Sequence, residues 1–168
     1  KKAILAIMVL GLCFGLATTA MAAEGTTEVT VTVNSIDELT VPTSVAITLE
    51  AVNATDPSKY AQAEAAEGGQ LTYIHNSGTA KKITASATDP QPTTNDITIT
   101  VKVDGGEEAP EPIVSNGTGQ TDVELWTGIA AGTYTKDLTW TAYATIANTP
   151  AGDYTFTVTF TATDVEGT

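Results

Sequence analysis

Threonine and apolar residues alternate over much of this chain, and that alternation most limits how the chain can fold. From Tyr154 to Thr163 every second residue is apolar and each residue between them is threonine. Similar alternation runs through residues 29–33 and 97–103. A period of two places successive side chains on opposite faces of a β-strand. The pattern therefore predicts half-buried antiparallel strands with an apolar inner face and a threonine-rich face in water.

We expect eight strands, near residues 28–34, 45–52, 70–76, 80–88, 96–103, 122–127, 133–146 and 153–164. Turn residues separate them, in sequences such as Asn76-Ser77-Gly78 and Pro150-Ala151-Gly152. Short strands with regular turns predict an all-β fold, an immunoglobulin-like antiparallel β-sandwich. One short helix is expected from Asp56, a capping residue, through the alanine-rich residues up to Ala66. Residues 105–121 are expected to form a polar loop.

One short pattern occurs twice. The sequence AGTYT at residues 131–135 leads into an alternating segment, and AGDYT at 151–155 leads into another twenty residues later. Because the repeat covers two strands only, it predicts adjacent elements of one sandwich and not a solenoid.

The beginning of the sequence predicts export. Lys1 and Lys2 precede an uncharged apolar run, and Ala20 and Ala22 give the small-residue pattern of a signal peptidase site. We expect residues 1–22 to be a signal peptide that is removed, and residues 23–168 to be a single secreted or cell-surface domain. The alternative is a retained membrane helix, for which the apolar run is shorter than the roughly 20 residues that span a bilayer.

Charge narrows the range of partners. The formal net charge is −13, no arginine is present, and removal of residues 1–22 takes away two lysines and no acid. Binding to nucleic acid or to an anionic membrane depends on lysine and arginine, so neither is an expected partner. The single cysteine, Cys13, lies in the predicted signal peptide, so no disulfide is expected in the domain.

The chemistry-bearing residues predict no enzyme and no obligate cofactor. His75 is the single histidine, and without a second histidine or a nearby cysteine it forms neither a zinc pair nor a cysteine–histidine nucleophile. Calcium is the metal that the sequence suits best, because Asp104, Glu107 and Glu108 in a glycine-containing loop offer hard oxygen ligands. A solvated acidic loop is the alternative. Asp89 and Asp96 form a second acidic pair of the same kind.

Two further features concern recognition. Trp126 has the opposite parity to its neighbours Val123 and Leu125, so it faces either outward, toward a glycan or a subunit, or the 105–121 loop. Trp140 shares the parity of Leu138 and is expected in the core. Asn53 and Asn116 fit the acceptor pattern for N-linked glycans.

The segment TPAGDYT at 149–155, followed by an alternating threonine-rich strand, resembles the closing strand of two secreted families. It is similar to the end of spore-coat-U-like pilins and of cell-wall-binding domains from Gram-positive surface proteins. The resemblance implies an immunoglobulin-like sandwich, and for the pilin group it implies assembly by donation of a strand between subunits. The predicted mature chain lacks the cysteines expected of that pilin group.

The sequence therefore predicts a structural protein that assembles with copies of itself into a pilus-like filament or surface layer. Val29, Val31 and Val33 form the expected assembly strand, since they alternate with threonine next to the freed N-terminus. Pairing of that strand within its own sandwich is the alternative. A module that binds a glycan or matrix partner through Trp126 is the rival function.

Overall fold

The computed structural model describes residues 28–165, and all of its regular structure is β-strand. The chain divides into two units, residues 1–33 and 34–168. Within the first unit, residues 28–33 form no strand. The predicted signal peptide, residues 1–22, lies outside the described residues. All strands belong to the second unit, whose two antiparallel sheets confirm the all-β prediction.

The larger sheet is built around β9, a strand of 12 residues that pairs with β3 through its first half and with β5 through its second half. Its strand order is β1-β3-β9-β5-β6-β7, and β2 also pairs with β9. The bounds are β1 Asp37–Thr40, β2 Ala63–Glu64, β3 Gln70–His75, β5 Thr98–Val103, β6 Val114–Ser115, β7 Thr118–Gly119 and β9 Gly132–Tyr143.

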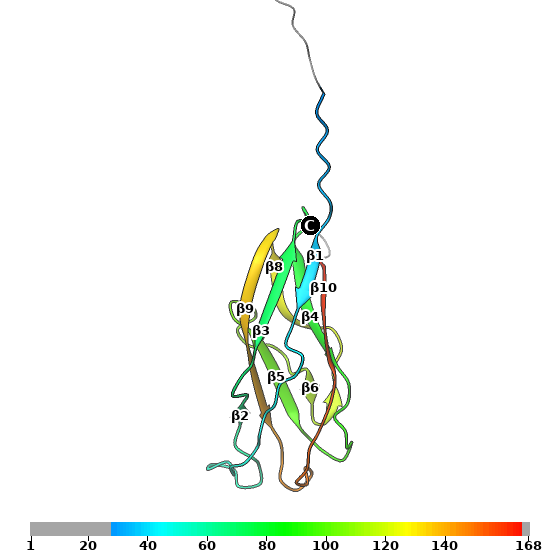
Figure 1. Cartoon of the computed structure of the whole chain (residues 1–168). Helices are drawn as coiled ribbons and strands as arrows, with labels where there is room; N and C mark the ends of the chain where they lie inside the picture. Colours follow the sequence, from blue (N-terminus) through cyan, green and yellow to red (C-terminus); the bar gives the residue numbers. More distant parts are fainter. Residues whose placement is uncertain (1–27, 166–168) are drawn as a thin grey trace, which may run out of the picture. The chain divides into compact units, whose positions relative to one another are not determined.

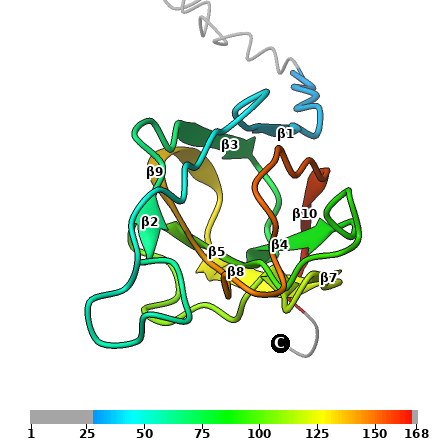
Figure 2. The ribbon, with the colours of Figure 1, turned by 90° about the horizontal axis from the view of Figure 1, so that it is seen from below.

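The smaller sheet has the order β10-β4-β8, with β4 at Lys81–Ala87, β8 at Val123–Ile129 and β10 at Val158–Asp164. Seen along the strands, the two sheets of the second unit curl around a common interior (Figure 2). Strands β1 and β10, which end their respective sheet orders, run next to each other in opposite directions (Figure 1). Each therefore has one edge without a partner strand among the described residues.

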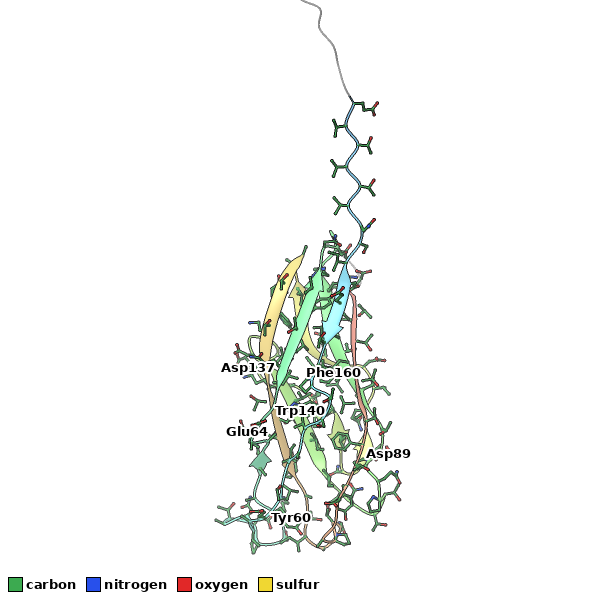
Figure 3. All side chains as sticks on the ribbon, in the orientation of Figure 1. Tyr60, Glu64, Asp89, Asp137, Trp140 and Phe160 are labelled. Carbon is green, nitrogen blue, oxygen red and sulfur yellow. The ribbon has the colours of Figure 1, made fainter. Side chains whose placement is uncertain are left out.

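The core lies between the sheets and consists of the alternating apolar residues. Tyr73, Ile83, Val101 and Leu125 are almost fully buried. Trp140 is also buried, as its parity predicted, and its indole N–H donates to the carbonyl of Gly68 at 3.0 Å. Figure 3 shows Trp140 and Phe160 within the sheets, while the acids Glu64, Asp89 and Asp137 lie at the periphery.

Strands were predicted correctly where a segment has a partner on each side, and wrongly at three places. Residues 28–34 form no strand, residues 45–52 contribute a single isolated bridge between Val52 and Tyr60, and β10 begins at Val158 instead of residue 153. Four short strands, β1, β2, β6 and β7, were not predicted. The β6–β7 hairpin lies within the expected 105–121 loop, where Ile113 and Val114 are fully buried.

The predicted helix after Asp56 is wrong. Asp56 caps a single turn instead, because its side chain accepts from the N–H of Ser58 at 3.2 Å and its carbonyl accepts from Lys59 at 3.1 Å. The alanine-rich residues then form β2, in which Ala63 and Glu64 pair with Ala142 and Thr141 of β9. Pairing with the sheet here outweighs the intrinsic helix propensity of alanine.

The sequence repeat corresponds to a repeated local structure. The hydroxyl of Tyr134 donates to the carbonyl of Ala130 at 2.9 Å, and that of Tyr154 donates to the carbonyl of Pro150 at 2.8 Å. Each tyrosine thus reaches back four residues, past the glycine of its own copy of the repeat. The two aromatic residues six positions further on, Trp140 and Phe160, meet edge to face with their rings 6.1 Å apart.

Candidate functional site

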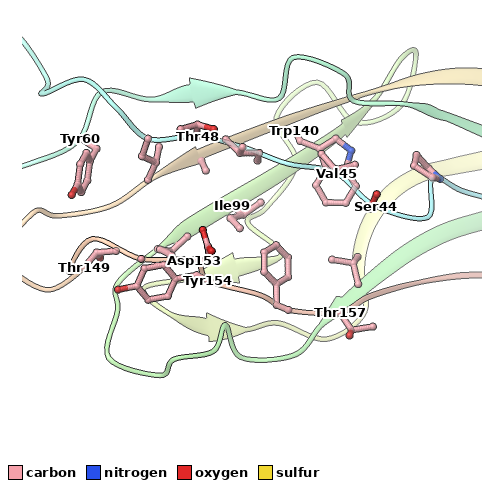
Figure 4. Close-up of a pocket in the computed structure, with 18 of the residues that line it drawn as sticks. Ser44, Val45, Thr48, Tyr60, Ile99, Trp140, Thr149, Asp153, Tyr154 and Thr157 are labelled. Carbon is pink, nitrogen blue, oxygen red and sulfur yellow. The ribbon is translucent and has the colours of Figure 1, made fainter.

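A groove lined by both apolar and polar side chains opens between the unpaired edges of the two sheets. Its volume is about 550 Å³, and its walls are residues 41–49 and residues 149–160 (Figure 4). Ile99, Trp140 and Ala142, from β5 and β9, form its floor. Among the lining residues in the described part of the chain, Asp153 alone is charged.

The first wall is an extended segment without sheet partners. Residues 42–50 form no backbone hydrogen bond with any other residue that the structure describes. Burial nevertheless alternates, since Val45, Ile47 and Leu49 are half-buried and Ala46 and Thr48 are exposed. This segment therefore has the conformation and side-chain alternation of a strand, but its hydrogen-bonding groups are unused.

The second wall has one used edge and one free edge. Thr155 exchanges two backbone hydrogen bonds with Gln91, at 2.8 and 3.0 Å, on the side that continues the β4–β10 pairing. In an extended chain the backbone groups of neighbouring residues point to the opposite edge. Those of Tyr154 and Phe156 therefore face away from Gln91, and both side chains are half-buried on the groove.

One end of the second wall is fixed by Asp96. Its carboxylate accepts from the N–H of Thr145 at 2.9 Å, from both the Thr145 and Thr149 hydroxyls, the latter at 2.7 Å, and from the Asn148 amide at 3.4 Å. Burial raises the pKa of Asp96, but these hydrogen bonds outweigh that effect, so its pKa lies below the ordinary value. Asp96 therefore holds the connection between the two copies of the repeat.

Lys81 joins the two sheets at the other end. Its ammonium lies 3.4 Å from Asp37 of β1 and 3.0 Å from Asp164 of β10, and its side chain is 11% exposed. A hydrogen bond from the Tyr73 hydroxyl, at 2.8 Å, holds the pKa of Asp37 below its usual range, and Lys81 adds to that effect. The two edges are thus tied together at this end and separate along the groove.

The predicted assembly residues have exposed side chains. Val29, Val31 and Val33 are 77%, 78% and 78% exposed. Large aliphatic side chains at that exposure, three in alternate positions, form an apolar face that nothing in the described chain covers. Sequence alternation found these three residues, and it also found the walls of the groove, but it could not show that the walls lack a strand between them.

The acidic loop residues are not brought together. Among residues 28–165 no group of three or more histidine, cysteine, aspartate or glutamate side chains is placed to hold a metal ion. Glu108 forms an ion pair with Lys102 at 3.2 Å instead, and the backbone N–H groups of Asp104 and Glu107 bond to Asp137 and Leu125. Calcium binding stays a prediction without a site in the structure.

The other candidate side chains are engaged in packing. Trp126 is half-buried, its ring meets Tyr134 edge to face at 5.2 Å, and the Lys136 ammonium lies over it at 5.6 Å. His75 is 2% exposed and stacks on Tyr73 at 5.0 Å, and its ring nitrogens have no hydrogen-bond partner among the described residues.

Among residues 28–165 no helix is long and apolar enough to cross a membrane. Comparison with protein-family models, with curated proteins and with solved structures gave no match. The resemblance of the C-terminal segment to pilins and wall-binding domains therefore stays a prediction, and the function must be argued from the two exposed apolar features described above.

Proposed function

We propose that this protein is a non-catalytic, extracellular structural subunit that assembles with copies of itself by addition of a β-strand, residues 28–34, to a neighbouring copy. The carrying observation is the alternating, exposed face of Val29, Val31 and Val33. The product of such assembly is a filament or a surface layer. Within this proposal the second unit is an immunoglobulin-like sandwich, in keeping with the two tyrosines that bond to upstream carbonyls at its strand starts.

The free energy gained by burying the three valines is comparable with the free energy that association costs. Full burial of one valine side chain stabilises by roughly 1.5–3 kcal/mol, so three contribute roughly 5–9 kcal/mol. Association costs about 4–15 kcal/mol in lost freedom. Valine burial alone therefore roughly balances that cost, and the main-chain hydrogen bonds of an added strand supply the surplus.

The rival function, recognition of a glycan by Trp126, has less support. Stacking on a sugar requires an open aromatic face. Lys136 lies over the Trp126 ring and Tyr134 meets the ring edge to face, so Trp126 of β8 already has partners from β9 of the other sheet.

A pair of matched double variants tests the proposal. We expect V31D/V33D to abolish high-mass assemblies of the exported protein, because two carboxylates would enter an apolar site. T30D/T32D carries the same added charge on the other face of the segment and should assemble as wild type does. Light scattering and electron microscopy of the purified proteins measure both. A wild-type protein that is monomeric at all concentrations, or equal assembly by both variants, would refute strand addition.

A further inference from the structure

We infer that the groove between residues 41–49 and 154–160 is the acceptor site, and that its occupant is residues 28–34 of a second copy of this chain. The inference rests on the proposed function and deepens it, because it names where the strand binds. Strand addition could in principle use any free sheet edge. This groove differs from the other free sheet edges in its two walls, its length and charge, and its apolar side chains.

The groove has the form of a strand position left empty. Its two walls are extended and run in opposite directions (Figures 1 and 4). Residues 42–50 have unused backbone groups, and the backbone groups of Tyr154 and Phe156 face away from Gln91. A strand placed between them would hydrogen-bond on both sides and join the two sheets. An ordinary exposed edge offers bonding on one side only.

The length and the low charge of residues 28–34 also match those of the groove. Residues 28–34 span about 23 Å when extended, as do residues 154–160 of the second wall, and residues 41–49 of the first wall span about 30 Å. The segment carries one charged residue, Glu28, and the groove carries one, Asp153. Two strongly acidic copies repel each other overall, so an interface that is almost free of charge is the least opposed place for them to meet.

The apolar groups are complementary. In the second wall Phe156, Val158 and Phe160 are half-buried on the groove, and in the first wall Val45, Ile47 and Leu49 are. A donated strand would direct alternate side chains, Val29, Val31 and Val33, into the space between them. Its threonines would face water, as they do elsewhere on these sheets.

The occupant must come from another copy. Residues 34–36 continue the β1 strand direction, because Asn76 accepts from the N–H of Ile36 at 2.8 Å through its side chain and donates to the carbonyls of Asn34 and Ile36. From Asn34 to Val41, where the groove begins, is about 23 Å of extended chain. Residues 28–33 reach about 20 Å at most. A copy's own three valines therefore stop short of its own groove.

Complementation between two defective variants tests the inference. Ile47→Asp blocks the groove and leaves the donor segment intact, whereas V31D/V33D does the reverse. We expect each alone to be monomeric, and an equal mixture to form a 1:1 dimer and nothing larger by native mass spectrometry. Ala46→Asp, at the exposed neighbouring position outside the groove, is the matched control and should assemble as wild type does.

The possible results distinguish an error in the acceptor groove from a failure of strand addition itself. If Ile47→Asp alone still forms high-mass assemblies while V31D/V33D does not, the groove is wrong and strand addition stands. If V31D/V33D still assembles, the proposed function itself fails. Two folded monomers that give no dimer when mixed would also overturn the acceptor assignment.

A second measurement covers the case in which Ile47→Asp does not fold. In protein without residues 1–22, and therefore without Cys13, a copy with V31C is mixed with a copy with V45C, I47C or L49C under oxidising conditions. We expect a disulfide-linked dimer for at least one of the three positions, and none with A46C. Assemblies that persist without a crosslink at any groove position would place the donor elsewhere.

Discussion

The two copies of the repeat, residues 132–143 and 152–163, share a pattern but differ in their surroundings. In the first copy Leu138, Trp140 and Ala142 are buried, at 4%, 6% and 4% exposure. In the second copy the equivalent Val158, Phe160 and Ala162 are only half-buried. The first copy forms sheet pairings on both edges, whereas β10 pairs with β4 alone. Burial of the same pattern is therefore set by the number of neighbouring strands.

This difference explains where alternation succeeds as a predictor. It identifies which face of a segment is apolar, and that holds for both copies. It does not reveal whether a second edge is occupied, because that depends on residues distant in the sequence. The second copy is therefore the one whose strand, β10, has an edge without a partner strand among the described residues.

The largest effect is expected from removing the paired aromatic side chains. Trp140→Ala should lower the free energy of unfolding by about 3–5 kcal/mol, because the indole is buried and bonded to Gly68. Phe160→Ala should cost the unassembled protein about half as much, since the ring is half-buried. Urea unfolding of monomeric V31D/V33D protein carrying each change measures the difference. Equal losses would contradict the contrast between the copies.

The second-largest effect on stability is expected at Asp96, because its carboxylate fixes the connection between the two copies of the repeat. Asp96→Asn should lower stability by about 1.5–3 kcal/mol at pH 7, where the carboxylate is ionised and hydrogen-bonded. Since the pKa of Asp96 is depressed in the folded state, its contribution is present above the ordinary value near 4 and is lost as the pH falls through the lower folded pKa. The difference between wild type and variant should therefore shrink in acid.

Thermal unfolding between pH 2 and pH 7 measures that change. Asp153→Asn, an exposed acid beside the groove, is the control and should leave the pH profile almost unchanged. A difference between Asp96→Asn and wild type that stays constant down to pH 2 would show that the carboxylate charge is not what holds Thr145 and Thr149.

The smallest effect concerns the feature that the copies share. Tyr134→Phe and Tyr154→Phe each remove one hydroxyl-to-carbonyl bond and should each cost about 0.5–1.5 kcal/mol. Because the local geometry is repeated, the two losses should be similar in chemical denaturation. A clearly larger loss at Tyr154 would mean that the hydroxyl there also orders the groove wall.

Sequence reasoning recovered the strands that have partners on both sides, such as β3, β4, β5 and β9, because their apolar faces are long and regular. It also placed Trp140 in the core. It missed β6 and β7, which are two residues each, too short for a period to be seen. It assigned a helix at residues 56–66 because alanine favours helices locally, while the pairing of Ala63 with Ala142 is a contact over a long sequence distance.

For the candidate site, the sequence supplied Val29, Val31 and Val33 and the alternating residues of both walls. The groove itself could not be predicted, because an unpaired edge is a property of sheet order and not of composition. The acidic loop shows the converse case. Asp104, Glu107 and Glu108 are close in sequence, yet the folded loop gives Glu108 a lysine partner and leaves the three acids without a common centre.

The unbonded wall at residues 42–50 also affects how the purified protein is expected to behave in solution. Free strand edges promote indiscriminate pairing and precipitation. Pro42, which lacks an N–H, stands at the start of this wall, and the net charge of −13 keeps copies apart while the carboxylates are ionised. The purified protein should therefore stay soluble at a pH well above the pKa of its acids and at modest ionic strength. Low pH or concentrated salt should cause non-specific aggregation.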